Sequence, residues 1–251
     1  MIILITGATA GFGKATAEFF AKNGYDVIIT GRRKERLEEL KKELKKKYKT
    51  DVLSLCFDVR KLKETQQAIG SISGKWKNID ILVNNAGLAA GLGPIQEGVF
   101  DDWEQMIDTN IKGLLYITRL VAPLMIKNGK GHIVNIGSIA GKEVYLNGNI
   151  YCATKHAVDA LNKAMRLDLL SHGIKVTGIN PGMAETEFSL VRFKGDKERA
   201  KQPYLGLKSL AADDIAETIY WVTTRPAHVN INDLVIMPTV QANTTTLIRK
   251  S

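Results

Sequence analysis

A tyrosine and a lysine stand four residues apart in this sequence, Tyr151 and Lys155, with Ser138 upstream of them. Residues at i and i+4 share one face of a helix, so both side chains can reach a single site. A free phenol, with a pKa near ~10, is a poor base at neutral pH, but a neighbouring ammonium favours the phenolate. A lowering by ~3 units would need roughly 4 kcal/mol of differential stabilisation. We therefore expect Tyr151 to exchange a proton with a carbonyl or alcohol oxygen that Ser138 holds and polarises.

Neither feature is specific by itself. A Y-x-x-x-K spacing arises often by chance in 251 residues, and Ser138 taken alone is better explained as a cap at the end of a strand. The pattern gains its meaning from a nucleotide-binding fold, in which the ends of successive strands meet at one site.

A glycine-rich turn supplies that context. The segment from Thr6 to Lys14 follows a predicted first strand and precedes a predicted helix. Glycines there let the backbone turn sharply and approach a pyrophosphate, while the free N–H groups of the helix face the phosphates. We expect dinucleotide contacts from Gly7, Thr9, Gly11, Phe12 and Gly13.

The end of the second predicted strand indicates which dinucleotide binds. An NAD site usually has Asp or Glu about 20 residues after the glycine turn, whereas this chain has Gly31-Arg32-Arg33. A carboxylate would repel a 2′-phosphate and a guanidinium would bind it, so we predict NADP(H), with Arg32 as the main contact. The alternative is that Arg32 and Arg33 simply begin a charged helix.

The elements that must position these residues alternate between short β-rich runs and longer helical patterns. Almost continuously apolar runs suit parallel strands that are covered on both faces. The alternation predicts an α/β fold, a Rossmann-type, doubly wound, parallel seven-stranded sheet in a single domain over residues 1–251. The expected strands are 2–6, 26–30, 51–57, 79–84, 132–138, 175–180 and 233–237, and the expected helices are 11–23, 32–48, 61–72, 101–127, 149–171 and 212–224.

Two segments break this rhythm. Residues 183–210 show no clear period, and we expect a substrate lid of mobile loop or short helices there. Residues 239–251 read as a C-terminal tail, either frayed or ordered by another subunit.

Composition excludes several other classes of protein. The net charge of +9 comes largely from a lysine-rich stretch at 41–49 that fits the solvated face of a helix, so we expect no nucleic-acid partner. No targeting segment or membrane span is visible, which predicts a soluble, cytoplasmic protein without a membrane partner. The two cysteines, Cys56 and Cys152, are expected to be buried thiols, and the histidines show no metal-ligand spacing.

These motifs occur in the chain in a fixed order: Thr6-Gly7-x-x-x-Gly11-x-Gly13, Asp58, Asn84-Asn85-Ala86-Gly87, Asn110, Ser138, Tyr151-x-x-x-Lys155 and Pro181-Gly182. In order and spacing they resemble the short-chain dehydrogenase/reductase family over nearly the whole chain. The resemblance implies further roles. Asp58 and Val59 would hold the adenine, Asn110 would anchor a water in a proton relay, and Lys155 would bind the nicotinamide ribose. Other cofactor contacts implied by it are Asn84, Ala86, Gly87, Pro181, Gly182 and Thr186.

Segments outside the shared motifs, among them 102–104, 186–196 and 226–232, resemble one group within that family, the NADP-dependent dehydrogenases of short 3-hydroxy acids. The resemblance implies serine, L-allo-threonine or 3-hydroxypropionate-type substrates, interconverted with their 3-oxo acids, and a homotetramer. A hydroxy acid needs a cation for its carboxylate, and we expect Arg192 or Lys194 of the lid to supply it. The alternative is that both are solvated lid charges.

Two other functions remain open at this point. One is a reductase of the same family that acts on a ketone, a sugar or an acyl-thioester. The other is a non-catalytic NADPH-binding regulator, which would need neither Tyr151 nor Lys155.

Overall fold

Seven parallel strands form one sheet in the order β3-β2-β1-β4-β5-β6-β7 in the computed structural model, which describes residues 1–249. The predicted α/β fold with a parallel seven-stranded sheet is therefore confirmed. The strands are β1 (Ile2–Ile5), β2 (Asp26–Gly31), β3 (Val52–Cys56), β4 (Ile79–Asn84), β5 (Gly131–Ile136), β6 (Ile174–Pro181) and β7 (Asp233–Ile236).

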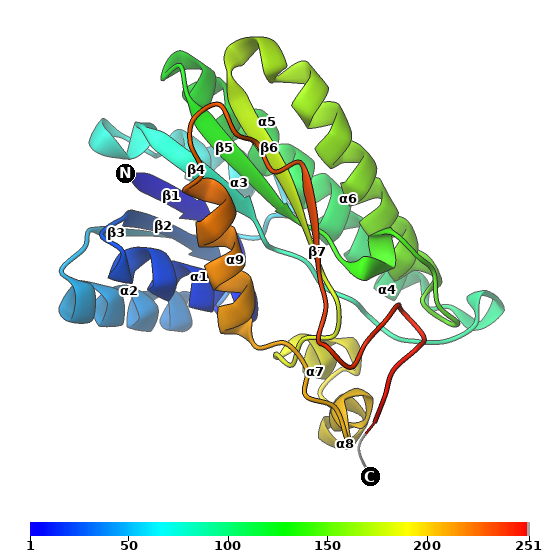
Figure 1. Ribbon diagram of the computed structural model, residues 1–251. Coiled ribbons are helices and arrows are strands. Elements are labelled where there is room, and N and C mark those ends of the chain that lie inside the picture. The colour runs from blue at the N-terminus through cyan, green and yellow to red at the C-terminus, as the bar shows by residue number, and fades with distance from the viewer. Residues whose placement is uncertain (250–251) are drawn as a thin grey trace.

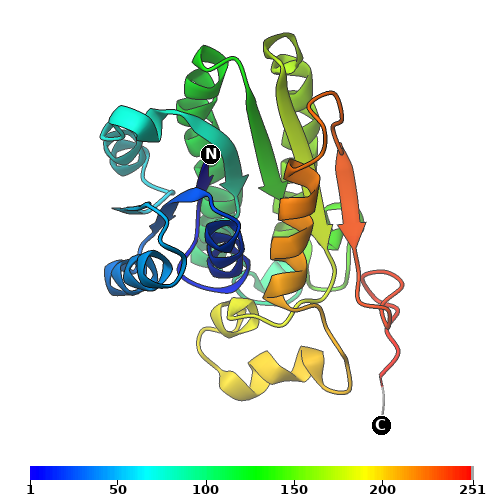
Figure 2. The ribbon, with the colours of Figure 1, turned by 60° about the vertical axis from the view of Figure 1, so that its left-hand side comes forward.

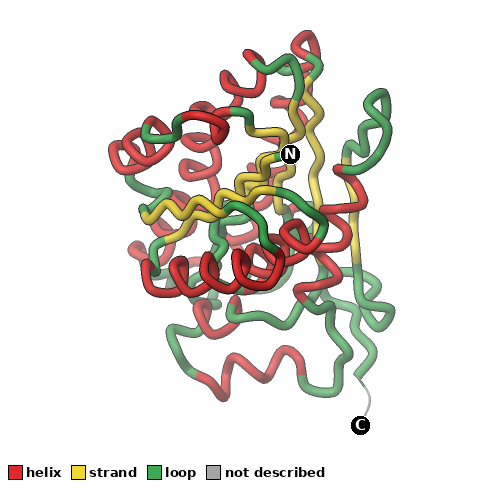
Figure 3. The backbone as a smooth tube through the Cα atoms, turned by 90° about the vertical axis from the view of Figure 1, so that its left-hand side faces the viewer, coloured by secondary structure: helices red, strands yellow, loops and turns green. Residues whose placement is uncertain are grey.

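Helices cover both faces of the sheet (Figure 3), because alternate residues of each buried strand point to opposite sides. Ile3 and Ile5 of β1 pack into a core with α1 (Gly11–Lys22), α2 (Lys34–Tyr48) and α9 (Ala212–Thr223). Ile2 and Leu4 pack into a second core with α3 (Leu62–Gly70), α5 (Leu114–Lys127) and α6 (Asn149–Asp168). None of the helices within residues 1–249 combines the length and the apolar character needed to cross a bilayer.

The helix predicted over 101–127 is wrong in one respect. The chain forms α4 (Phe100–Ile107), a π-helical turn over Asp108–Gly113 and then α5. A π-helical turn admits an extra residue, so side chains beyond it shift around the helix axis, and such turns are frequent at functional sites. Asn110 lies in this turn.

The carboxyl ends of the strands point toward the segment predicted to be a lid (Figures 1 and 2). That segment contains two short helices, α7 (Phe188–Arg192) and α8 (Lys197–Lys201). The tail turns back beside it: Gln241 pairs with Leu247, and Arg249 Nη2 donates to the Pro203 carbonyl at 3.1 Å. Residues 239–249 are thus ordered by contacts within the chain, while 250–251 of the predicted tail lie outside the described residues.

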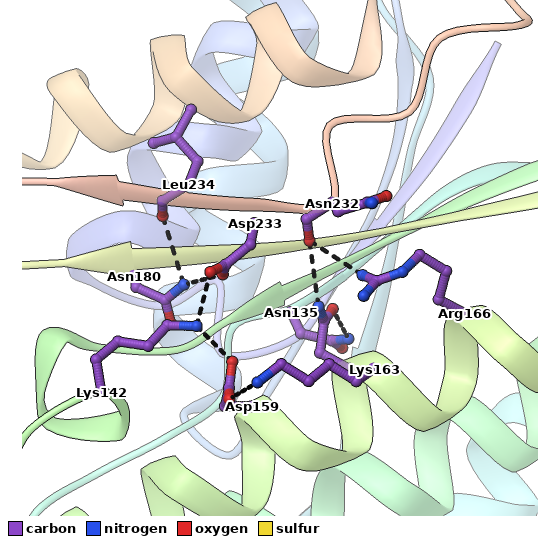
Figure 4. Close-up of polar contacts among 10 residues, drawn as sticks. Asn135, Lys142, Asp159, Lys163, Arg166, Asn180, Asn232, Asp233 and Leu234 are labelled. Atoms are coloured by element: carbon purple, nitrogen blue, oxygen red, sulfur yellow. Dashed lines mark hydrogen bonds and ion pairs between the residues drawn. The ribbon is translucent and has the colours of Figure 1, made fainter.

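A polar network connects the segment after β5 with α6 and β7 (Figure 4). Lys142 Nζ bonds Asp159 of α6 at 2.5 Å and Asp233 of β7 at 2.7 Å. Asn180 of β6 donates to the second Asp233 oxygen at 2.6 Å. The network fixes the turn after Ser138 against the helix that carries Tyr151, so both are held by one set of ion pairs.

Candidate active site

A cleft of about 550 Å³ opens at the carboxyl ends of the strands, between the glycine-rich turn and α7. Its size is typical of sites that hold a small molecule or cofactor. Most residues predicted from the sequence line it: Gly7, Thr9, Gly11, Phe12, Arg32, Arg33, Asp58, Val59, Ala86, Gly87, Ser138, Tyr151, Lys155, Pro181, Gly182, Thr186 and Arg192. Four do not line it, namely Gly13, Asn84, Asn110 and Lys194.

The glycine-rich turn fits a pyrophosphate. Gly7 and Gly11 have φ of +68° and +51°, a region that favours glycine. A Cβ on Gly13 would stand 2.4 Å from the Gly7 carbonyl oxygen, so Gly13 permits the close packing of α1 under the turn rather than touching a ligand. The first turn of α1 holds no acidic residue, and Ala10 provides no side-chain cap, which leaves N–H groups for an anion.

The two arginines after β2 have different partners. Arg32 lies 3.9 Å from Asp58 and is 55% exposed, a loose pairing that leaves its guanidinium able to meet a phosphate. Arg33 donates to Thr9 Oγ1 through Nε and Nη2, at 3.0 and 2.7 Å. The residues at this end of the cleft therefore fit an anionic 2′-phosphate better than a ribose hydroxyl.

Arg33 also binds the lid, which sequence reasoning missed. Its Nη1 lies 2.9 Å from Glu187, the residue that precedes α7, and Arg36 binds the same carboxylate at 2.8 Å. Thr9, Arg33 and Glu187 thus form a chain of contacts from the glycine turn to the lid. No local pattern could have revealed it, because Arg33 and Glu187 are 154 residues apart in sequence.

Tyr151 and Lys155 meet in the cleft as predicted, on one face of α6. Ser138 lies beside them, and its Oγ accepts a hydrogen bond from the Ala140 N–H at 3.1 Å. Ser138 therefore caps the turn after the strand and also lines the cleft.

The prediction that Lys155 lowers the pKa of Tyr151 is wrong. Burial raises the pKa of Tyr151 above its ordinary value, and Tyr145 raises it further, against hydrogen bonding with Ser138 and the charge of Arg192. Burial also lowers the pKa of Lys155 to about 8. Lys155 Nζ donates to the Ile136 carbonyl at 2.8 Å and lies 6.0 Å from the Tyr151 ring centroid, so the loss of hydration outweighs its effect on the phenol.

Asn110 lies behind the cleft and fixes its wall. It donates to the Leu88 carbonyl and to Thr154 Oγ1, and its Oδ1 accepts from the Leu88 N–H, at 2.9, 3.0 and 2.9 Å. A Cβ on Gly87 would stand 3.3 Å from Asn110 Oδ1 and 3.6 Å from Lys155 Nζ, so the two polar groups flank the same point. Asn84 has no place in the cleft and holds the sheet centre instead, donating to side chains of α5 and β5.

The two lid cations predicted to bind a carboxylate are separated by the fold. Arg192 lies in the cleft, where its guanidinium carbon stands 5.4 Å from the Tyr151 ring centroid and 5.5 Å from that of Tyr145. Its Nη2 donates to the Tyr145 hydroxyl at 2.7 Å. Lys194 instead pairs with Asp102 at 2.9 Å, outside the cleft.

The tail adds residues that the sequence did not predict as part of the site. Gln241 and Thr244 line the cleft, and Gln241 Oε1 accepts a hydrogen bond from the Met183 N–H at 2.7 Å.

The two cysteines differ in exposure: Cys152 is buried as expected, but Cys56 is exposed at the end of β3.

Comparison with known proteins agrees with this geometry. Residues 1–196 match the family described as short chain dehydrogenase. The chain is 49% identical over 243 residues to the NADP-dependent 3-hydroxy acid dehydrogenase of Salmonella typhi, covering 96% of each chain. It is 48% identical over 240 residues to the serine 3-dehydrogenase of Agrobacterium fabrum, covering 96% of this chain and 94% of that one. The closed form of a serine dehydrogenase complexed with NADP+ superimposes with a TM-score of 0.92, at 47% identity over 100% of both chains.

Proposed function

Because this chain belongs to the short chain dehydrogenase family, we propose that it is an NADP(H)-dependent oxidoreductase that interconverts a short 3-hydroxy acid and its 3-oxo acid. Serine, L-allo-threonine and 3-hydroxypropionate are the substrate types. Relatives at 49% and 48% identity that carry the names 3-hydroxy acid dehydrogenase and serine 3-dehydrogenase support this assignment. The observation that carries it is the guanidinium of Arg192, which stands 5.4 Å from the ring of the catalytic phenol inside the cleft.

A bound dinucleotide would supply or accept the hydride, and residues of this chain would transfer the proton and hold the substrate. In reduction, Tyr151 gives its phenolic proton to the substrate carbonyl oxygen, which Ser138 holds by a hydrogen bond. Burial raises the pKa of Tyr151, so the phenol keeps that proton at neutral pH, the form that reduction needs. Oxidation requires the phenolate, so the rate of oxidation should increase as the pH rises.

Lys155 and Asn110 serve this proton transfer. The Lys155 amine, with a pKa of about 8, is still mainly protonated at neutral pH and would bind the nicotinamide ribose. Asn110 would hold a water beside Lys155 at the point that both flank next to Gly87. These groups then connect Tyr151 to solvent without exposing the phenol, since Tyr151 is only 8% exposed.

Arg192 would bind the substrate carboxylate. Its Nη2 contacts Tyr145 and its Nε contacts the Gly91 carbonyl, at 2.7 and 3.2 Å, so the guanidinium has a fixed direction, and its other N–H groups have no hydrogen-bond partner among the described residues. A fixed planar fork binds a carboxylate through two parallel hydrogen bonds. A neutral ketone or sugar would bring no counter-charge to this half-buried cation, which favours an acid over the other substrate classes.

The test is an assay of NADPH formation at 340 nm with NADP+ and a panel of 3-hydroxy acids, beside NADPH oxidation with oxo acids and neutral ketones. We expect turnover with the acids and little with the ketones. Tyr151→Phe should bind NADPH with unchanged affinity and lose turnover. Equal rates on ketones, or retained turnover in Tyr151→Phe, would contradict the proposal.

We also propose a homotetramer in the cytoplasm. Strand β7 forms one edge of the sheet, and Val235 on it is 47% exposed, so this edge offers unpaired backbone groups and an apolar side chain to a second copy. The two free thiols suit a reducing compartment. Light scattering coupled to size exclusion measures the assembly, and a monomer at micromolar concentration would contradict it.

A further inference from the structure

Lys194 occupies a backbone position where glycine is usual. It lies two residues beyond α7 with φ +54°, its N–H donates to the Val191 carbonyl at 3.1 Å, and Gly195 follows with φ +92°. Such a left-handed residue at the end of a helix costs a side chain conformational energy that glycine would not incur. The lysine side chain makes an ion pair that can offset this strain.

Its partner is a buried carboxylate. Asp102 lies on α4 with its side chain 9% exposed, and Lys194 Nζ stands 2.9 Å from Oδ2. Within the part of the chain that the structure describes, this is the one ion pair of Asp102. A carboxylate held away from water without a counter-charge is unfavourable, so Asp102 draws the end of α7 toward α4.

The same stretch of chain is held a second time by Gly91. The Gly91 N–H donates to the Arg192 carbonyl at 2.9 Å, and Arg192 Nε donates to the Gly91 carbonyl at 3.2 Å. Gly91 also abuts the ion pair, since a Cβ on it would stand 3.1 Å from Asp102 Oδ2. Asp102, Gly91 and the end of α7 therefore form one contact, with Arg192 two residues from Lys194.

We propose that Asp102 and Lys194 are positioning residues, whose ion pair clamps the end of α7 and thereby aims the Arg192 guanidinium at the carboxylate of the substrate. This inference rests on the proposed function, and it assigns Lys194 a role in holding the lid rather than in touching substrate. The clamp holds the carboxyl end of α7, whereas Arg33 contacts Glu187 before the first residue of that helix, so we expect the dinucleotide end of the cleft to be unaffected.

The variants Lys194→Gly and Asp102→Asn test it. Glycine suits the turn at position 194, so Lys194→Gly removes the ion pair without straining the backbone. We expect each variant to raise KM for the 3-hydroxy acid about tenfold, with kcat within about twofold and the Kd for NADPH unchanged. The double variant should be no worse than either single one, because both remove the same pair. The control Lys208→Met removes another exposed lid cation and should leave KM unchanged.

The methyl ester of the same hydroxy acid separates positioning from general damage. It lacks the carboxylate, so its kcat/KM should be equal in wild type and in both variants. A loss on the ester as large as on the acid would mean a merely structural role. If Lys194→Gly raised KM but Asp102→Asn did not, Lys194 would touch the substrate directly and the clamp would be wrong.

Arg192→Met separates a failure of the proposed function from a failure of the clamp. If it raises KM for the acid while neither clamp variant does, the proposed function stands and the inference fails. If it leaves KM unchanged, Arg192 does not bind the substrate carboxylate, and both the carboxylate-binding role and the clamp are overturned. Melting temperatures within about 2 °C of wild type identify Lys194→Gly as folded should Asp102→Asn prove unstable.

Discussion

Replacing Arg32 by methionine should weaken NADPH binding and spare NADH. The two arginines after β2 are not equivalent in the fold. Arg33 already uses Nε and Nη2 on Thr9 and Nη1 on Glu187, whereas the one side-chain partner of the Arg32 guanidinium within residues 1–249 is Asp58 at 3.9 Å. Arg32 can therefore turn its guanidinium to a 2′-phosphate without losing another good contact.

The size of the effect follows from the exposure of Arg32. A hydrogen bond to a charged group contributes about 1.5–3 kcal/mol. Since the Arg32 side chain is 55% exposed, the lower part of that range applies, about 1.5–2 kcal/mol. Each ~1.4 kcal/mol is a factor of ten, so the Kd for NADPH should rise roughly 10- to 30-fold.

The measurement is a fluorescence titration of wild type, Arg32→Met and Arg33→Met with NADPH and with NADH. We expect Arg32→Met to affect NADPH alone. Arg33→Met should weaken both dinucleotides by similar factors, because Arg33 connects the glycine turn to the lid through Glu187. A selective loss of NADPH in Arg33→Met, with Arg32→Met unchanged, would reverse the assignment of the two residues.

Three further changes have simple readouts. His132 is 3% exposed, and burial lowers its pKa from 6.5 to about 3, so on acidification the unfolded state takes up a proton before the folded state does. The free energy of unfolding, measured by urea titration, should therefore fall by about 2 kcal/mol from about pH 7 to about pH 5, and His132→Gln should lose this pH dependence. Gly13→Ala should abolish NADPH binding in the same fluorescence titration, because its Cβ would stand 2.4 Å from the Gly7 carbonyl oxygen. The matched variant Gly70→Ala should bind normally, because its Cβ would meet no atom of residues 1–249 within 4 Å. Asp159→Asn weakens two ion pairs on α6, and a calorimetric scan should show the protein destabilised by about 1–2 kcal/mol.

The sequence by itself determined what depends on short stretches of chain. The parallel sheet follows from strands that are almost continuously apolar, such as β4, because both faces of a parallel sheet are covered. The glycine turn and the pairing of Tyr151 with Lys155 follow from local backbone geometry and helical periodicity. Their meeting in one cleft was predictable too, since the carboxyl ends of parallel strands lie at the same edge of the sheet.

The tertiary structure decided how charges are paired and how deeply they are buried. Lys194 and Arg192 looked alike in the sequence, and only the approach of α4 gave Lys194 the carboxylate of Asp102. The pKa of Tyr151 rose rather than fell because desolvation depends on everything packed around the phenol, not on the nearest lysine. Electrostatic energies and salt-bridge partners are set by distances between residues far apart in the chain, and a linear pattern does not contain those distances.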